Sequence, residues 1–147
     1  MAVQLAKKNK VDTLILQSTF TDADKARSDG VGGYIPGKLA KMFGLLGFDD
    51  FNSEKDIVDV NANKIIILHG SEDTVVPCKH SEDLYKALPA SSKEKIFTKL
   101  LGSSHGNYID FYEKAELYDP SGDSKKNKVN LNLWDTLNEY ILGSKKA

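Results

Sequence analysis

Three short apolar segments without regular polar alternation predict the strands of a largely buried sheet. Val11 to Ser18 and Lys64 to Gly70 have the β-branched and leucine-rich character of strands that are covered on both faces. Lys95 to Leu101 alternates more, which favours a position nearer an exposed edge. The segment Ser81 to Leu88 has apolar residues at helical spacing, so it predicts a helix between the second and third strands. Strands that alternate with helices indicate a parallel sheet and an α/β fold.

The two ends of the chain predict further helices. Val3 to Asn9 has the pattern of the last two turns of a helix, and no Ser, Thr, Asp or Asn precedes it as a cap. Leu131 to Leu142 carries one apolar stripe and is followed by Gly143, which suits the end of a helix. We expect this last helix to close the core.

Two stretches are less regular, and we interpret them as additions to one domain that spans residues 1–147. Residues 19–63 are rich in glycine, and only Lys38 to Leu46 has clear helical spacing, so they predict a cap-like excursion. Its apolar residues would either pack over the core, which is the more common case, or line the mouth of a pocket. Asp119 to Lys128 is charged and rich in turn residues, which predicts an inserted, solvated loop.

Composition excludes some classes of function. The 147 residues include 20 Lys and Arg against 21 Asp and Glu, so no excess positive charge would recruit nucleic acid. The longest apolar run, Ile65 to Leu68, is too short to span a bilayer, and no apolar leader opens the chain. With the single cysteine, Cys78, these features predict a cytoplasmic location for the chain as given.

The strongest chemical signal lies in two turns that follow predicted strands. The segment IIILHGSEDTVVP, Ile65 to Pro77, places Asp73 just beyond a strand, and LLGSSHGNY, Leu100 to Tyr108, places His105 just beyond the next one. In parallel sheets, reactive groups gather beyond the carboxyl ends of the strands, so the two side chains should meet. A carboxylate that orients a histidine in this way suits acyl transfer.

These turns resemble those of the α/β-hydrolase superfamily, in particular its abhydrolase-domain and prolyl-oligopeptidase-like serine hydrolases. The matching residues are Gly70, Asp73, Val76 and Pro77 in the acid turn and Gly102, His105, Gly106 and Asn107 in the histidine turn. The resemblance implies the C-terminal part of that fold, with about three parallel strands, the last three of the sheet, and flanking helices. It also implies Asp73 as the triad acid, His105 as the triad base, and carboxylic esters, thioesters or amides as substrates.

The same resemblance implies a Gly-x-Ser-x-Gly nucleophile elbow that precedes the acid and the histidine in the chain. No such motif precedes Asp73 in the sequence, and the one literal match, Gly102 to Gly106, is the histidine turn itself, so the nucleophilic serine of the elbow is missing from this chain. Four serines lie near the expected site, but none of them lies in a strand-to-helix elbow that precedes the acid: Ser18, Ser71, Ser103 and Ser104. Isolated activity is therefore not expected. The alternative is a non-catalytic half-hydrolase domain that binds a partner or a small ligand.

Several candidate residues also have a purely structural interpretation. Asp73 would cap the turn before a helix that starts near Pro77. His69 would pack at its strand end, and His80 would be a surface residue of the helix. Cys78, at a helix start, would be either a reactive thiolate or an ordinary thiol. We expect no cofactor and no metal, because His69, Asp73 and His80 lack the spacing of zinc ligands.

The strand Val11 to Ser18 would have one empty side if it is the first of only three. An apolar open edge is a template for pairing with another chain, so we expect self-association through Thr13 to Gln17. Two-fold pairing at that edge would be antiparallel and would give a dimer.

Overall fold

The computed structural model describes residues 2–29, 52–89, 94–105 and 115–117. Within them, one four-stranded sheet has the strand order β1-β2-β3-β4. The strands are β1 (Val11–Gln17), β2 (Ala62–Gly70), β3 (Glu94–Leu100) and β4 (Ala115–Leu117). The first three are parallel and confirm the three predicted strands, whereas β4 runs antiparallel to β3.

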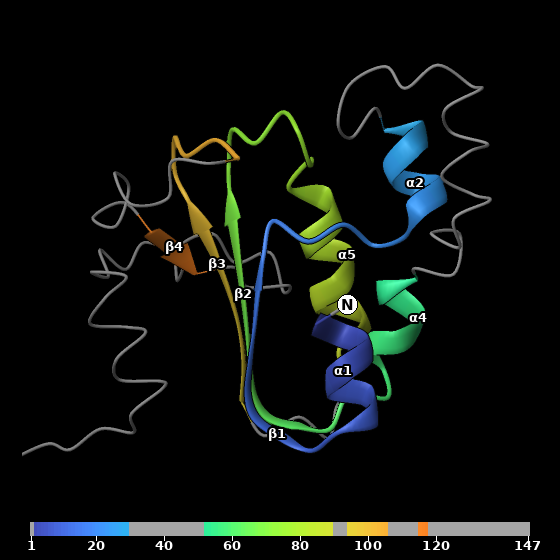
Figure 1. The fold of residues 1–147 in the computed structure, drawn as a ribbon. Helices are drawn as coiled ribbons and strands as arrows, with labels where there is room; N and C mark the ends of the chain where they lie inside the picture. Colours follow the sequence, from blue (N-terminus) through green and yellow to red (C-terminus); the bar gives the residue numbers. More distant parts are fainter. Residues whose placement is uncertain (1, 30–51, 90–93, 106–114, 118–147) are drawn as a thin grey trace, which may run out of the picture.

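The register of the parallel strands brings their carboxyl ends to one edge of the molecule. Gln17 of β1 lies opposite Leu68 of β2, and Gly70 of β2 lies opposite Leu100 of β3. The turns that follow β2 and β3 therefore start side by side, at the top of Figure 1. The third strand lies next to the edge rather than at it, because β4 pairs with its last three residues.

Four helices are described: α1 (Ala2–Lys8), α2 (Ala23–Ser28), α4 (Ser53–Ile57) and α5 (Lys79–Ala87). Figure 1 shows α1, α4 and α5 on one side of the sheet. The predicted helices Val3 to Asn9 and Ser81 to Leu88 correspond to α1 and α5. This is an α/β arrangement of parallel strands and flanking helices.

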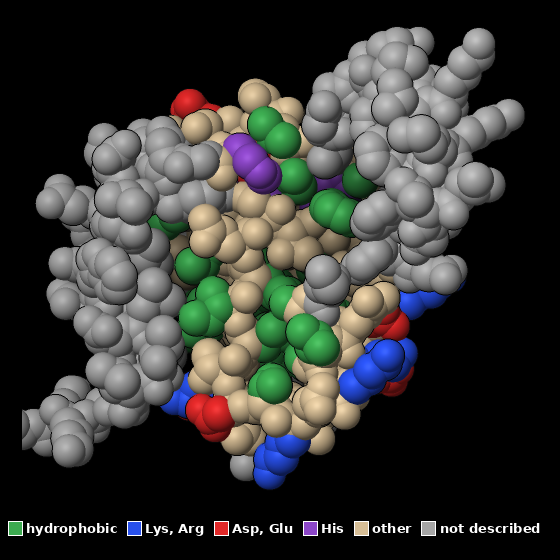
Figure 2. Space-filling model, in the orientation of Figure 1, with side chains coloured by type: hydrophobic (Ala, Val, Ile, Leu, Met, Phe, Trp, Pro, Cys, Tyr) green, Lys and Arg blue, Asp and Glu red, His purple; other side chains and the backbone are tan. Residues whose placement is uncertain are grey.

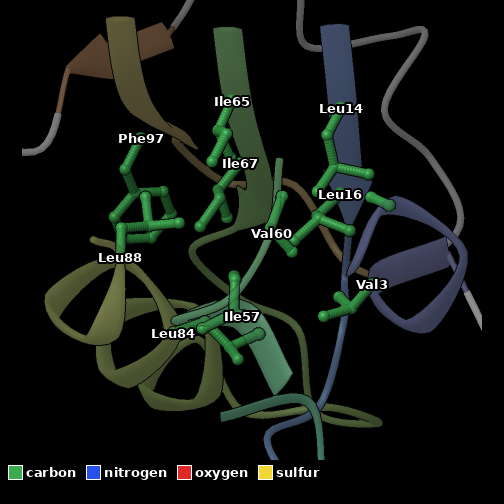
Figure 3. Packing of buried hydrophobic residues seen from close by; sticks show 11 residues of the cluster. Val3, Leu14, Leu16, Ile57, Val60, Ile65, Ile67, Leu84, Leu88 and Phe97 are labelled. Carbon is green, nitrogen blue, oxygen red and sulfur yellow. The ribbon is translucent and has the colours of Figure 1, made fainter. Parts of the chain in front are cut away.

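The main core lies between the sheet and these three helices. Alternate residues of β1 and β2, together with Phe97 of β3, point toward the helices, which send apolar side chains back toward the strands (Figure 3). Burying each side chain of this size stabilises the fold by about 1.5–3 kcal/mol. The labelled members are Val3, Leu14, Leu16, Ile57, Val60, Ile65, Ile67, Leu84, Leu88 and Phe97.

The short helix α4 forms because its first turn is capped. The side chain of Asn52 accepts a hydrogen bond from the backbone N–H of Lys55, at 2.8 Å. This bond satisfies one of the N–H groups that a helix start leaves without a partner. Lys7 of α1 lies 3.0 Å from both Asp56 and Asp59, so ion pairs link α1 to α4 and to the residues just after it.

The ends of the predicted excursion, residues 19–63, lie side by side. Asp22 and Asn52 form an isolated antiparallel bridge, and the N–H of Glu54 donates to the carbonyl of Thr21 at 3.2 Å. The end residues form α2 and α4, and β2 already begins at Ala62. The centre of the excursion, with the predicted helix at 38–46, lies outside the described residues. So do the predicted loop at 119–128 and the predicted helix at 131–142.

In the described ranges, no helix has the length and apolar character needed to cross a membrane.

Strand β1 is an outer strand of the described sheet, and its apolar side chains are not all covered. Leu14 and Leu16 are buried, whereas Ile15 between them is 41% exposed. Figure 2 shows hydrophobic side chains gathered on the face of the molecule that carries β1. Among the described strands none pairs with the outer side of β1, and this edge carries an exposed isoleucine.

We propose that two copies of the isolated chain pair through Thr13 to Gln17 of β1, antiparallel and about a two-fold axis. Sedimentation velocity at micromolar concentration should then detect a dimer. Ile15→Lys should shift it toward monomer, because two copies of the charge would meet across the axis. Leu5→Lys is the matched control, since Leu5 is an exposed apolar residue of α1. A wild-type chain that sediments as a compact monomer would contradict the proposal.

Candidate active site

The structure brings together the two side chains that the turns predict. Nδ1 of His105 lies 2.9 Å from Oδ2 of Asp73, so the ring donates a hydrogen bond to the carboxylate. Asp73 follows β2 and His105 follows β3, as expected for neighbouring parallel strands. The Asp73 side chain is fully buried, whereas the His105 side chain is 42% exposed. Figure 2 shows a histidine side chain at the surface at this end of the sheet.

The other carboxylate oxygen of Asp73 shapes its own turn. Oδ1 accepts hydrogen bonds from the backbone N–H groups of Val75 at 2.9 Å and Val76 at 2.8 Å. Asp73 therefore makes the turn-capping contacts with one carboxylate oxygen and the contact with His105 with the other. The capped element is the turn itself, because α5 begins only at Lys79.

A third group reaches this carboxylate from β1. The hydroxyl of Ser18, the residue directly after β1, donates to Oδ2 of Asp73 at 2.9 Å. The sequence pattern does not reveal this contact, because it marks Ser18 only as a serine near the expected site. Ser18 follows a strand that lies parallel to β2, and this position is the signal that could have indicated its contact with Asp73. Because its hydroxyl binds the acid, Ser18 is not presented to His105 as a nucleophile.

The hydrogen bonds to Asp73 determine its charge. Burial alone raises the pKa of this carboxyl, but hydrogen bonds from the Val76 N–H, His105 and Ser18 outweigh burial and hold the pKa below its ordinary value. Asp73 is therefore ionised at neutral pH. A buried carboxylate next to Nδ1–H is the arrangement that stabilises a histidine cation.

Backbone hydrogen bonds hold the acid turn and the histidine turn together. The N–H of Ser71 donates to the carbonyl of Leu100, and the N–H of Glu72 donates to the carbonyl of Ser103, each at 3.0 Å. The N–H of Gly102 donates to the Ser71 hydroxyl at 2.9 Å. Gly102 has a φ of 74°, a backbone conformation that glycine adopts without strain. The relative position of Asp73 and His105 is thus set by bonds between their turns.

Gly70 lets the two turns approach each other. A Cβ at this position would lie 2.3 Å from the carbonyl oxygen of Ser103 and 2.8 Å from its carbon. Both atoms belong to the backbone, so any side chain at residue 70 would have to push the histidine turn away.

His69 is fully buried and packs at its strand end, as predicted. Its Nε2 lies 2.8 Å from the carbonyl of Val76, and a carbonyl only accepts, so Nε2 carries the proton. Nδ1 then accepts from the hydroxyl of Ser81 at 2.6 Å. Burial lowers the pKa of this imidazole, so it is neutral. Nε2 also lies 3.4 Å from Oδ2 of Asp73, which makes His69 a second histidine beside the acid.

The prediction that His80 is a surface residue is wrong, because its side chain is fully buried. Its Nδ1 accepts from the backbone N–H of Thr21 at 3.3 Å and lies 2.9 Å from the Thr21 hydroxyl. Its Nε2 lies 3.3 Å from a carboxylate oxygen of Asp29, without hydrogen-bond geometry. Burial lowers the pKa of His80. The segment after β1 packs on the first turn of α5, a tertiary contact that the sequence pattern does not reveal.

The structure also decides against a reactive thiolate at Cys78. The side chain is half-buried, and burial raises its pKa to about 11. The thiol is therefore protonated at neutral pH. The stabilisation that a helix start gives to a thiolate does not offset the hydration that the thiolate loses on burial. Across the described part of the chain, no cluster of three His, Cys, Asp or Glu residues is placed to hold a metal ion.

No family model matches the chain. Two curated relatives do: the uncharacterized protein YfhR of Salmonella typhi is 31% identical over 108 residues, and that of Salmonella typhimurium strain LT2 is 32% identical over 108 residues. Each match covers 71% of this chain and 34% of the relative. The chain thus spans about a third of the length of these relatives.

Among solved structures, the chain is similar to the esterase domain of a Rhodothermus marinus protein, with a TM-score of 0.53 and 15% identity. The match covers 74% of this chain and 48% of that domain. A puromycin-hydrolyzing peptidase of Mycobacterium tuberculosis matches with a TM-score of 0.48 and 16% identity, over 71% of this chain and 16% of the peptidase. The likeness to the esterase domain shows that the chain has a hydrolase-like fold.

Proposed function

We propose that this chain carries the acid and the base of a serine hydrolase that acts on carboxylic esters, thioesters or amides. The observation that supports this most directly is the 2.9 Å hydrogen bond between buried Asp73 and partly exposed His105. The two residues follow neighbouring parallel strands of a hydrolase-like fold. An ionised, buried acid bound to an accessible imidazole is what acyl transfer by a serine requires.

In this proposal Asp73 keeps the Nδ1 proton of His105 in place, so the lone pair of Nε2 is available as a base. Among the described residues, none makes a hydrogen bond to that Nε2. Nε2 would take the proton of a serine hydroxyl as the serine oxygen attacks the acyl carbon. It would then give this proton to the departing alcohol, thiol or amine, while Asp73 stabilises the imidazolium between the two steps.

The nucleophile and the oxyanion-hole donors would come from a part of a longer protein that precedes Met1. In triads of this chain order the serine comes first, within Gly-x-Ser-x-Gly. The curated relatives are about three times as long as the stretch they share with this chain, which leaves room for such a part.

Reconstitution tests the proposal. The chain would be produced in one polypeptide with the residues encoded upstream of it, and turnover of p-nitrophenyl esters of increasing acyl length would be measured. We expect turnover, and labelling by a fluorophosphonate probe at a serine in Gly-x-Ser-x-Gly. An upstream sequence without this motif, or a longer protein that neither turns over esters nor is labelled, would contradict the proposal.

A non-catalytic hydrolase-like domain is the second candidate, because within the 147 residues no Gly-x-Ser-x-Gly precedes the acid turn. Such a domain would bind a partner or a small ligand without needing its acid or its base. Asp73→Asn and His105→Ala would then leave partner or ligand binding unchanged, and the longer protein would stay inactive. Ester turnover that depends on both residues would exclude this candidate.

A further inference from the structure

Ser18 has an unusual backbone conformation for its residue type. Its φ is 44°, and among the described residues it is the only non-glycine residue with a positive φ. The left-handed region costs an ordinary L-residue about 1–2 kcal/mol, whereas glycine adopts it readily. Backbone geometry alone would favour glycine at this position. The presence of serine therefore indicates that its hydroxyl makes a contact that glycine could not make.

Two hydrogen bonds hold Ser18 in this conformation. Its backbone N–H donates to the carbonyl of Leu68 at 3.0 Å and so continues the ladder between β1 and β2. Its hydroxyl donates to Oδ2 of Asp73 at 2.9 Å. The left-handed turn thus leads the chain away from the sheet while it keeps the hydroxyl on the carboxylate.

Two histidines lie within reach of the Asp73 oxygen that Ser18 binds. Nδ1 of His105 lies 2.9 Å from Oδ2, and the protonated Nε2 of His69 lies 3.4 Å from it. Oδ1 is already bound by two backbone N–H groups, so the Ser18 hydroxyl is the donor that holds Oδ2 in addition to these histidines. Without it, the carboxylate could turn toward His69 and away from the accessible histidine.

We propose that Ser18 is a positioning residue of the site, whose hydroxyl holds Oδ2 of Asp73 facing His105 rather than His69. This inference rests on the proposed function, because it assigns a role to Ser18 in the acid–base pair. Ser18 contacts neither the substrate nor the nucleophile in this role and acts only through Asp73.

The test separates the hydroxyl from the backbone by using two variants of the whole chain. Ser18→Gly removes the hydroxyl and relieves the left-handed backbone, whereas Ser18→Ala removes the hydroxyl and keeps the strain. The pKa of Asp73 would be followed through its carboxyl ¹³C signal during a pH titration. Described titratable groups that interact with this carboxylate are His69 on β2, His105 after β3 and Cys78 before α5, so their signals would be followed as well.

Both variants should raise the pKa of Asp73 by the same amount, because each removes a donor to the ionised form. Their stabilities should differ, with Ser18→Gly unfolding at a higher urea concentration than Ser18→Ala. Ser28→Gly is the control and should leave the pKa of Asp73 unchanged, because its hydroxyl binds the Lys25 carbonyl. A wild-type pKa in either Ser18 variant would overturn the inference, since a residue that only shapes the turn would give that result.

Activity distinguishes this inference from the proposed function. In the reconstituted hydrolase, Ser18→Gly should lower kcat by about tenfold or more with KM unchanged. If the Ser18 variants raise the pKa of Asp73 but the longer protein shows no ester turnover, the role of the Ser18 contact is supported and the proposed function is contradicted. Ester turnover with an unchanged Asp73 pKa and an unchanged kcat would overturn the inference alone.

Discussion

Asp73→Asn is expected to lower kcat of the reconstituted hydrolase by about 10⁴-fold. The asparagine oxygen can still accept from the N–H groups of Val75 and Val76, so the turn should keep its shape. The amide nitrogen then replaces Oδ2 and cannot accept the Nδ1 proton of His105. The ring would place its proton on Nε2 instead, which leaves it without a lone pair toward the serine.

The measurement is kcat on a p-nitrophenyl ester, normalised to the concentration of serine that a fluorophosphonate labels. His105→Ala should lose a similar factor, and the double variant should lose little more, because the two residues act as one unit. Asp83→Asn is the matched control, since Asp83 pairs with Lys25 away from this site. A loss smaller than tenfold in Asp73→Asn would show that Asp73 is not the acid of the triad.

Gly70→Ala is expected to destabilise the chain by about 1–3 kcal/mol, or more, and to separate Asp73 from His105. The new methyl group would lie 2.3 Å from the Ser103 carbonyl oxygen, and this backbone atom cannot yield as a flexible side chain would. The bond between the Glu72 N–H and that same carbonyl would stretch as the histidine turn moves. Loss of stability and loss of the acid–histidine contact should therefore appear together.

Urea unfolding followed by circular dichroism would measure the stability of Gly70→Ala. The low-field NMR signal of the His105 Nδ1 proton would report on the bond to Asp73. Val75→Ala is the control, because Val75 lies in the same acid turn with a partly exposed side chain, and its effect should stay within about 0.5 kcal/mol. Wild-type stability in Gly70→Ala would mean that the two turns are not in the close contact described here.

The strands could be predicted from sequence because each is a continuous apolar run between turn residues. The prediction Val11 to Ser18 differs by one residue from β1, Lys64 to Gly70 lies within β2, and Lys95 to Leu101 is shifted by one residue from β3. The helices α2 and α4 were not predicted, because neither is long enough to show an apolar period. The three residues of β4 are likewise too few for a pattern.

The contact between Asp73 and His105 could be predicted from the sequence, whereas the contacts around them could not. Asp73 and His105 each follow a strand within a turn motif, so local sequence indicated both residues. The contacts of Ser18 with Asp73 and of Thr21 with His80 join residues from different elements. Such contacts depend on how the elements pack, which neither spacing nor composition records.

The order of the crossovers suggests how the site assembles during folding. The connection from β2 to β3 runs through α5 and is shorter than the one from β1 to β2, so it costs less loop-closure entropy. The unit β2–α5–β3 has the lower contact order and should form before β1 docks on it. Asp73 and His105 both belong to that earlier unit, whereas Ser18 arrives with the later strand. An intermediate that lacks β1 would then already hold its acid next to its base, but with the carboxylate not yet oriented by the serine.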